Sequence, residues 1–154
     1  MNARAIALTL VLCMSGVAVS LAQNPNIGTW KLNERKSKFA PGVTKNHTVV
    51  YEDAGEDIKV TTDGTDKDGK PTHSEWTGKF DGKDYPVTGD PNSDARSVTK
   101  IDDRHLDFDV KNRGVVTTVG HVIVSTDGRS RTVRTTSSDA TGKKASSTAV
   151  YDKQ

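Results

Sequence analysis

An arginine and a tyrosine near the end of the chain could jointly bind one anion. Arg131 and Tyr151 flank the short motif Asp139-Ala140-Thr141-Gly142-Lys143. A three-residue turn at this motif would place the two residues opposite each other in a hairpin. The guanidinium could then hold a carboxylate in two hydrogen bonds beside the phenol hydroxyl. We therefore predict an anchor for an anionic or polar headgroup, and the alternative is an Arg131 that extends into water and pairs with nothing.

The histidines and the spaced carboxylates do not predict a metal site. A metal ion needs three or four converging donors, whereas the histidines are on four separate candidate strands, as His47, His73, His105 and His121. The run "TDGTDKDG" has spaced aspartates but lacks the glutamate that completes a calcium loop. We predict no metal and no cofactor.

The chain also lacks the residue combinations that catalysis needs. It contains no Gly-x-Ser-x-Gly, no glycine-rich phosphate loop and no His-Glu-x-x-His. Residues 23–154 contain no cysteine, which excludes a thiolate nucleophile, and no two carboxylates are expected to face each other in a dry pocket. We predict a protein that is not an enzyme.

Short strands separated by turns must position these side chains. Turn signals such as Asp81-Gly82, Asn112 to Gly114 and Asp127-Gly128 recur about every ten residues, which is typical of an antiparallel meander. Val and Thr, with 14 and 18 copies in residues 23–154 against 2 Leu, favour strands. We expect strands at about 27–33, 44–53, 57–63, 71–80, 83–88, 95–101, 104–112, 114–125, 129–137 and 144–152.

Two hairpins can be registered from a shared Asp-x-x-Gly-Lys turn, at Asp66 and at Asp139. A type I turn followed by a left-handed glycine fits both motifs, with the aspartate capping the turn. This register pairs Val60 with Trp76 in the first hairpin. In the second it pairs Val133 with Ala149, Thr135 with Ser147, and Arg131 with Tyr151. Asn33 is a possible cap for one helical turn in "ERKSKFAPGV", which Pro41-Gly42 ends.

Alternation along the strands divides them into an inward and an outward face. In "HLDFDVK" the apolar residues share one face and the charged residues the other. The inward face of the last two strands is small and partly polar, since it holds Val133, Thr135, Ala145, Ser147 and Ala149. We interpret this lining as an internal cavity. The candidate ligand-binding residues are Tyr51, Trp76, Phe108, His121, Arg131 and Tyr151.

The first 22 residues have the features of a cleavable signal peptide. A basic start at Arg4 precedes an apolar run from Ala5 to Val19, and small residues end the segment at Ala22. The run is shorter than the roughly 20 residues that a membrane span needs. We expect a secreted or periplasmic protein whose single mature domain covers residues 23–154.

The charge distribution and the polar outward faces of the strands exclude two further classes of protein. Residues 23–154 hold 21 Lys and Arg against 20 Asp and Glu, interspersed and without a basic block, so we expect no nucleic-acid binding. The outward faces are polar and lack the apolar band of an outer-membrane barrel, so we expect no membrane span. We expect a monomer.

The segments "GTWKL" at the start of the first strand and "STAVYDK" at the end of the last resemble the calycins, the superfamily of lipocalins and fatty-acid-binding proteins. The resemblance implies a single antiparallel up-and-down β-barrel, here of about eight to ten strands. It also implies that Gly28 and Trp30 form the Gly-x-Trp whose indole seals one barrel end.

The chain departs from the fatty-acid-binding proteins in the residues that define their ligand. Their final strand carries Arg-x-Tyr, whereas this chain has Ala149-Val150-Tyr151, and Ile123 aligns with their second arginine. Residues 34–43 are also too few for the two helices that cover those barrels. These departures favour a bacterial lipocalin-like protein with a ligand of its own.

These observations lead to one expected function and one alternative. We expect an exported barrel that binds a small apolar or amphipathic molecule in its interior. The alternative is a barrel without a ligand that acts through its loops or edge strands on a protein partner or an envelope component.

Overall fold

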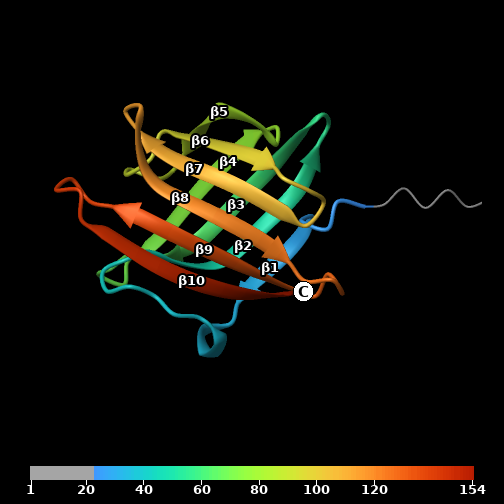
Figure 1. The fold of residues 1–154 in the computed structure, drawn as a ribbon, viewed down its shortest axis with the longest axis horizontal. Helices are drawn as coiled ribbons and strands as arrows, with labels where there is room; N and C mark the ends of the chain where they lie inside the picture. Colours follow the sequence, from blue (N-terminus) through green and yellow to red (C-terminus); the bar gives the residue numbers. More distant parts are fainter. Residues whose placement is uncertain (1–22) are drawn as a thin grey trace, which may run out of the picture.

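A computed structural model describes residues 23–154 as ten antiparallel strands that close into a barrel (Figure 1). The strands follow one another around the barrel in chain order, and β1 pairs with β10 to close it. The predicted all-β up-and-down barrel is confirmed, whereas the predicted signal peptide lies outside the described residues. The strands are β1 (Gly28–Leu32), β2 (Lys45–Ala54), β3 (Asp57–Thr65), β4 (Pro71–Gly78), β5 (Asp81–Thr88), β6 (Ala95–Lys100), β7 (His105–Asn112), β8 (Val115–Val124), β9 (Ser130–Ser138) and β10 (Lys144–Lys153).

The shared turn motif sets the register of two hairpins, as predicted. The Asp66 N–H donates to the Lys70 carbonyl oxygen at 2.9 Å, and the Asp139 N–H donates to that of Lys143 at 3.0 Å. Gly69 adopts a φ of +77°, in the left-handed region where glycine carries no side-chain penalty. The resulting register pairs Val60 with Trp76 on β3 and β4, and Arg131 with Tyr151 on β9 and β10. The anchor pair is therefore side by side in the structure.

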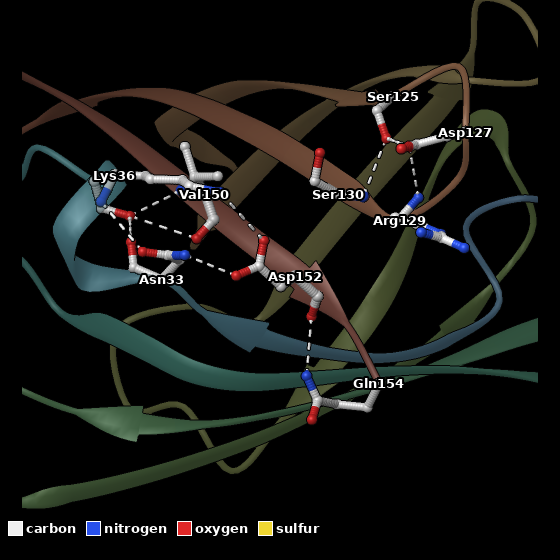
Figure 2. Close-up of polar contacts among 10 residues, drawn as sticks. Asn33, Lys36, Ser125, Asp127, Arg129, Ser130, Val150, Asp152 and Gln154 are labelled. Carbon is white, nitrogen blue, oxygen red and sulfur yellow. Dashed lines mark hydrogen bonds and ion pairs between the residues drawn. The ribbon is translucent and has the colours of Figure 1, made fainter.

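The connection between β1 and β2 makes a short excursion and then rejoins the barrel wall. Asn33 caps the single 3-10 turn η1 (Glu34–Lys36), as predicted. Figure 2 shows the Asn33 side chain held against β10, where its Nδ2 donates to Asp152 Oδ2 at 2.7 Å. Lys38 then forms an isolated antiparallel bridge with Thr148. The connection therefore contacts β10 from Ser147 to Asp152.

The two ends of the barrel differ, one being a closed end and the other an open end. At the closed end the start of β1 lies beside the C-terminus, where the Gln154 N–H donates to the Thr29 carbonyl oxygen, and the Trp30 side chain is fully buried (Figure 1). The Trp30 Nε1–H donates to the Asn26 carbonyl oxygen at 2.8 Å, as expected for a buried indole that must satisfy its donor. The open end carries the β1–β2 connection and the turns at 66–70, 89–94, 113–114 and 139–143.

Inward and outward faces alternate as the sequence predicts. The inward side chains form rows around the barrel, and the largest buried ones are Trp30, Trp76 and Leu106. Among residues 23–154, no helix has the length and apolar character needed to cross a membrane.

Candidate functional site

The interior of the barrel has an aromatic wall on β2, β4 and β5. Trp76 stacks on Phe80 with ring centroids 6.3 Å apart, and Tyr85 meets Trp76 edge-on at 5.9 Å. Tyr51 approaches Phe80 edge-on at 6.5 Å. Trp76 is 2% exposed and its Nε1–H donates to the Arg96 carbonyl oxygen at 3.0 Å. These contacts give the wall a fixed shape on which an apolar surface can lie.

The opposite wall, on β8, β9 and β10, is built from small residues. Strand pairing aligns Phe108, Gly120, Thr135 and Ser147 in one row around the barrel. Thr135 and Ser147 stay half-buried although they point toward the barrel axis. Ser147 Oγ accepts a hydrogen bond from the Ala40 N–H at 3.0 Å, so the β1–β2 connection contacts this row at the open end. The internal cavity stays a prediction from the small residues of this lining.

Phe108 reaches across its row toward β8. A Cβ placed on Gly120 would lie 2.2 Å from the Phe108 ring, so only glycine leaves room for the ring at this point. Phe108 itself is half-buried and faces the interior, as predicted for a cavity-lining residue.

Arg131 lies at the closed end of the barrel interior, where aromatic rings enclose it. Its guanidinium carbon is 4.8 Å from the ring centroids of Trp30 and Tyr51 and 5.0 Å from that of Tyr151. Arg131 is 2% exposed, so the alternative in which it extends into water is wrong. Its Nε and Nη1 have no hydrogen-bond partner, and no carboxylate within residues 23–154 lies within 4 Å of it. Cation–π contacts with three rings are what offset the burial of its charge.

The turn before β9 holds the backbone that leads into Arg131. Figure 2 shows Ser125, Asp127, Arg129 and Ser130 joined by hydrogen bonds in this turn. The Arg129 N–H donates to Asp127 Oδ1 at 3.0 Å, and the Ser130 N–H donates to Ser125 Oγ at 3.0 Å. These bonds fix the backbone immediately before Arg131.

Tyr151 faces inward beside Arg131 and is 4% exposed. Its hydroxyl donates to the Asn46 carbonyl oxygen at 3.0 Å. Burial raises the pKa of Tyr151 to about 12, although Arg131 acts in the opposite sense. The hydroxyl is thus a neutral group that can still accept a hydrogen bond at neutral pH.

The structure adds Arg96, an interior cation that the sequence analysis missed. Arg96 is on β6, in the cross-strand row of Tyr85 and Val110. Its Nε is enclosed without a hydrogen-bond partner, and its guanidinium carbon lies 5.8 Å from the Phe108 ring centroid. The alternation of "ARSVTK" could have identified it, because Arg96 shares a face with the buried Val98.

His121 does not belong to the interior, and its prediction as a ligand-binding residue inside the barrel is wrong. It lies on the outer face of β8, where its Nδ1 is 2.6 Å from Asp107 Oδ1 on β7. Its neighbours Gly120 and Val122 are the buried residues, so the two-residue period of the strand turns His121 outward. The other five candidates, Tyr51, Trp76, Phe108, Arg131 and Tyr151, surround the interior.

Two hollows are found among the described residues, and neither is lined by Arg131 or Arg96. One, of about 550 Å³, lies at the open end between residues 34–45 and 65–69. The other, of about 420 Å³, is on the outer face of β7 and β8 and includes His105 and His121. Within residues 23–154, no three His, Cys, Asp or Glu side chains are grouped as a metal site requires.

Comparison with known proteins gives no relative by sequence. No model of a known protein family matches the chain, and no curated protein matches it. Among solved structures, it is similar to EF1p2_mFAP2b bound to DFHBI, with 11% identity, a TM-score of 0.49 and coverage of 84% of this chain and 94% of that one. It is also similar to the redesigned β-barrel mFAP1 bound to DFHBI, with 14% identity, a TM-score of 0.48 and coverage of 84% and 95%.

A natural protein among these structures is lobster apocrustacyanin A1. The identity is 14%, the TM-score is 0.39, and the match covers 86% of this chain and 63% of that one. The order and pairing of its ten strands show that the chain is a closed antiparallel up-and-down β-barrel.

Proposed function

We propose that the barrel binds a small apolar or amphipathic molecule in its interior. The observation that carries this proposal is the row of Thr135 and Ser147, which point toward the barrel axis and yet keep exposed surface. The aromatic wall opposite them supplies the apolar surface that most small-molecule sites use. A ligand between the two walls would contact both of them.

The residues divide into those that contact the body of the ligand and those that close the site. Phe108 and Tyr51 are half-buried and inward-facing, so their rings are the accessible aromatic surface. Trp76 supports them from within the wall, because Phe80 and Tyr85 cover its ring. Arg131 and Tyr151 form the floor of the site at the closed end, with Arg131 held by three rings.

Export and assembly belong to the same proposal. The features of residues 1–22 support an exported protein, secreted or periplasmic, and we infer a monomer that binds its ligand without catalysis. A second candidate function, a barrel that contacts a protein partner, has one observation in its favour. The apolar side chains of Val115, Val116 and Val119 on β8 are 65%, 41% and 42% exposed.

The proposal is tested by filling the interior. Binding of N-phenyl-1-naphthylamine, a neutral apolar dye that becomes fluorescent out of water, is titrated with the protein and two variants. Thr135→Phe places a ring in the free space, whereas Thr136→Phe places the same ring on the outer face of the same strand. We expect the unsubstituted protein to bind the dye saturably. Thr135→Phe should weaken the affinity at least tenfold, whereas Thr136→Phe should change it less than twofold. Equal affinities of the two variants, or no saturable binding to the unsubstituted protein, would overturn the proposal.

A further inference from the structure

Arg96 is a cation inside the barrel without an ion-pair partner among residues 23–154. It is half-buried and lies in the row nearest the open end, with Val110, Thr118, Ser137 and Ala145. No Asp or Glu of residues 23–154 forms an ion pair with it, and its enclosed Nε has no hydrogen-bond partner. Burying an ion without a partner is costly. An anion from outside the chain that paired with Arg96 would lower this cost.

The two interior arginines differ in how their charge is compensated. Arg131 has three aromatic rings within 5.0 Å of its guanidinium carbon, whereas Arg96 has one ring, Phe108, at 5.8 Å. The attraction between a cation and a ring weakens near a separation of about 6 Å. The charge of Arg96 is therefore the less compensated of the two, whereas aromatic rings of the fold stabilise the charge of Arg131.

Asp90, an acidic residue whose charge raises the pKa of Arg96, already has hydrogen-bond partners of its own. The Asp90 carboxylate accepts hydrogen bonds from Ser93 Oγ at 2.6 Å and from the Asn92 N–H at 2.9 Å. Burial lowers the pKa of Arg96, and the Tyr51 hydroxyl and the Asp90 carboxylate act weakly in the opposite sense. The guanidinium nevertheless remains a cation at neutral pH.

The position of Arg96 also predicts how a bound molecule would be oriented along the barrel axis. Strand pairing places two rows between its row and that of Arg131, one containing Phe108 and Thr135 and the other containing Leu106 and Val133. Neither of these rows contains a charged side chain on β7 to β10. A molecule with its charge at Arg96 would thus lay an apolar body against Phe108 and toward the closed end.

We propose that Arg96 binds the anionic headgroup of the ligand and that the ligand is a small amphipathic organic anion, such as a carboxylate or a sulfonate. The proposal rests on the proposed function, because it assigns the charge and orientation of the molecule in the same interior site. It moves the anchor from Arg131, which the rings enclose, to Arg96, which is half-buried in the row nearest the open end. A planar apolar body would suit the Phe108 ring beside the guanidinium.

The test compares two dyes that differ by one anionic group. 8-Anilino-1-naphthalenesulfonate has the ring system of N-phenyl-1-naphthylamine with an added sulfonate. Both are titrated with the unsubstituted protein, with Arg96→Met, which keeps an apolar stem and removes the charge, and with Arg134→Met, which removes an exposed cation from the outer face of β9. We expect Arg96→Met to weaken the sulfonate about ten- to hundredfold, the range of a charge-assisted hydrogen bond. The neutral dye should change less than twofold, and Arg134→Met should leave both dyes unchanged.

The outcomes separate this proposal from the proposed function. If the neutral dye binds in the interior and Arg96→Met weakens both dyes equally or neither, the anion site is overturned and the apolar site stands. If neither dye binds the unsubstituted protein, both proposals fail. Thermal unfolding without dye gives a second readout, because removal of an uncompensated cation should leave the midpoint of Arg96→Met unchanged or raised. A midpoint lowered by more than 5 °C would show that Arg96 has a structural partner and would overturn its role as a free anchor.

Discussion

The guanidinium carbon of Arg131 lies 4.8 Å from the Trp30 ring, and the two side chains are 2% and 0% exposed. This contact joins β9 to β1 through the interior of the closed end, beyond the reach of the backbone ladder between β9 and β10. The closed end is therefore a packed cluster of a cation and aromatic rings.

Trp30 should be the most important side chain for stability at the closed end. Trp30→Ala removes a fully buried indole and its hydrogen bond to Asn26. We expect the free energy of unfolding to fall by about 3–5 kcal/mol, as measured by urea denaturation. A midpoint that does not move would contradict the role of Trp30 in sealing the barrel.

Arg131 should stabilise the fold, in contrast to Arg96. Arg131→Met removes a cation from three rings, and desolvated cation–π contacts contribute about 2 kcal/mol or less each. We expect a loss of about 1–3 kcal/mol in the same denaturation experiment. Unchanged or increased stability would show that the rings do not compensate the buried charge of Arg131.

The buried phenol of Tyr151 predicts a loss of stability in alkali. Its pKa is raised from about 10 to about 12 because burial disfavours the phenolate. The folded state therefore holds the proton more tightly than the unfolded state, and this contribution is complete below pH 10 and lost as the pH rises to 12. The linked change is roughly 2 kcal/mol. The difference in unfolding free energy between the protein and Tyr151→Phe, measured from pH 8 to 12, should show this decline, and a pH-independent difference would refute it.

Export can be tested at the predicted cleavage position. Ala22→Asp replaces the small residue that a signal peptidase requires. We expect the variant to accumulate as a precursor longer by about 22 residues than the processed protein in a secreting host. Intact-mass measurement distinguishes the two, and an unsubstituted protein that retains residues 1–22 after export would contradict the prediction.

Local patterns predicted the fold well because barrel register is set by short hairpins. The Asp-x-x-Gly-Lys turns at Asp66 and Asp139 predicted two registers from three shared residues, and Arg131 is opposite Tyr151 as predicted. The burial of Arg131 could not be read from its hairpin. It depends on Trp30 and Tyr51, which come from strands about 100 and 80 residues away.

The face of His121 was not evident for a different reason. The strand "VVTTVGHVIV" carries valines on both faces, so its alternation does not separate inside from outside. Only the pairing of Phe108 with Gly120 shows that the glycine faces inward and the histidine outward. Arg96 was missed because a charged residue in a short strand is ordinarily expected on the water-facing side.

The central claim, that the interior binds a small amphipathic molecule, is tested most directly by native mass spectrometry of the processed protein purified from its own host. We predict a reproducible added mass of a few hundred daltons, within the size range of drug-sized ligands for such sites, which denaturing conditions remove and which Thr135→Phe prevents. A spectrum that shows only the mass of the polypeptide, from the unsubstituted protein and from Thr135→Phe alike, would contradict the claim.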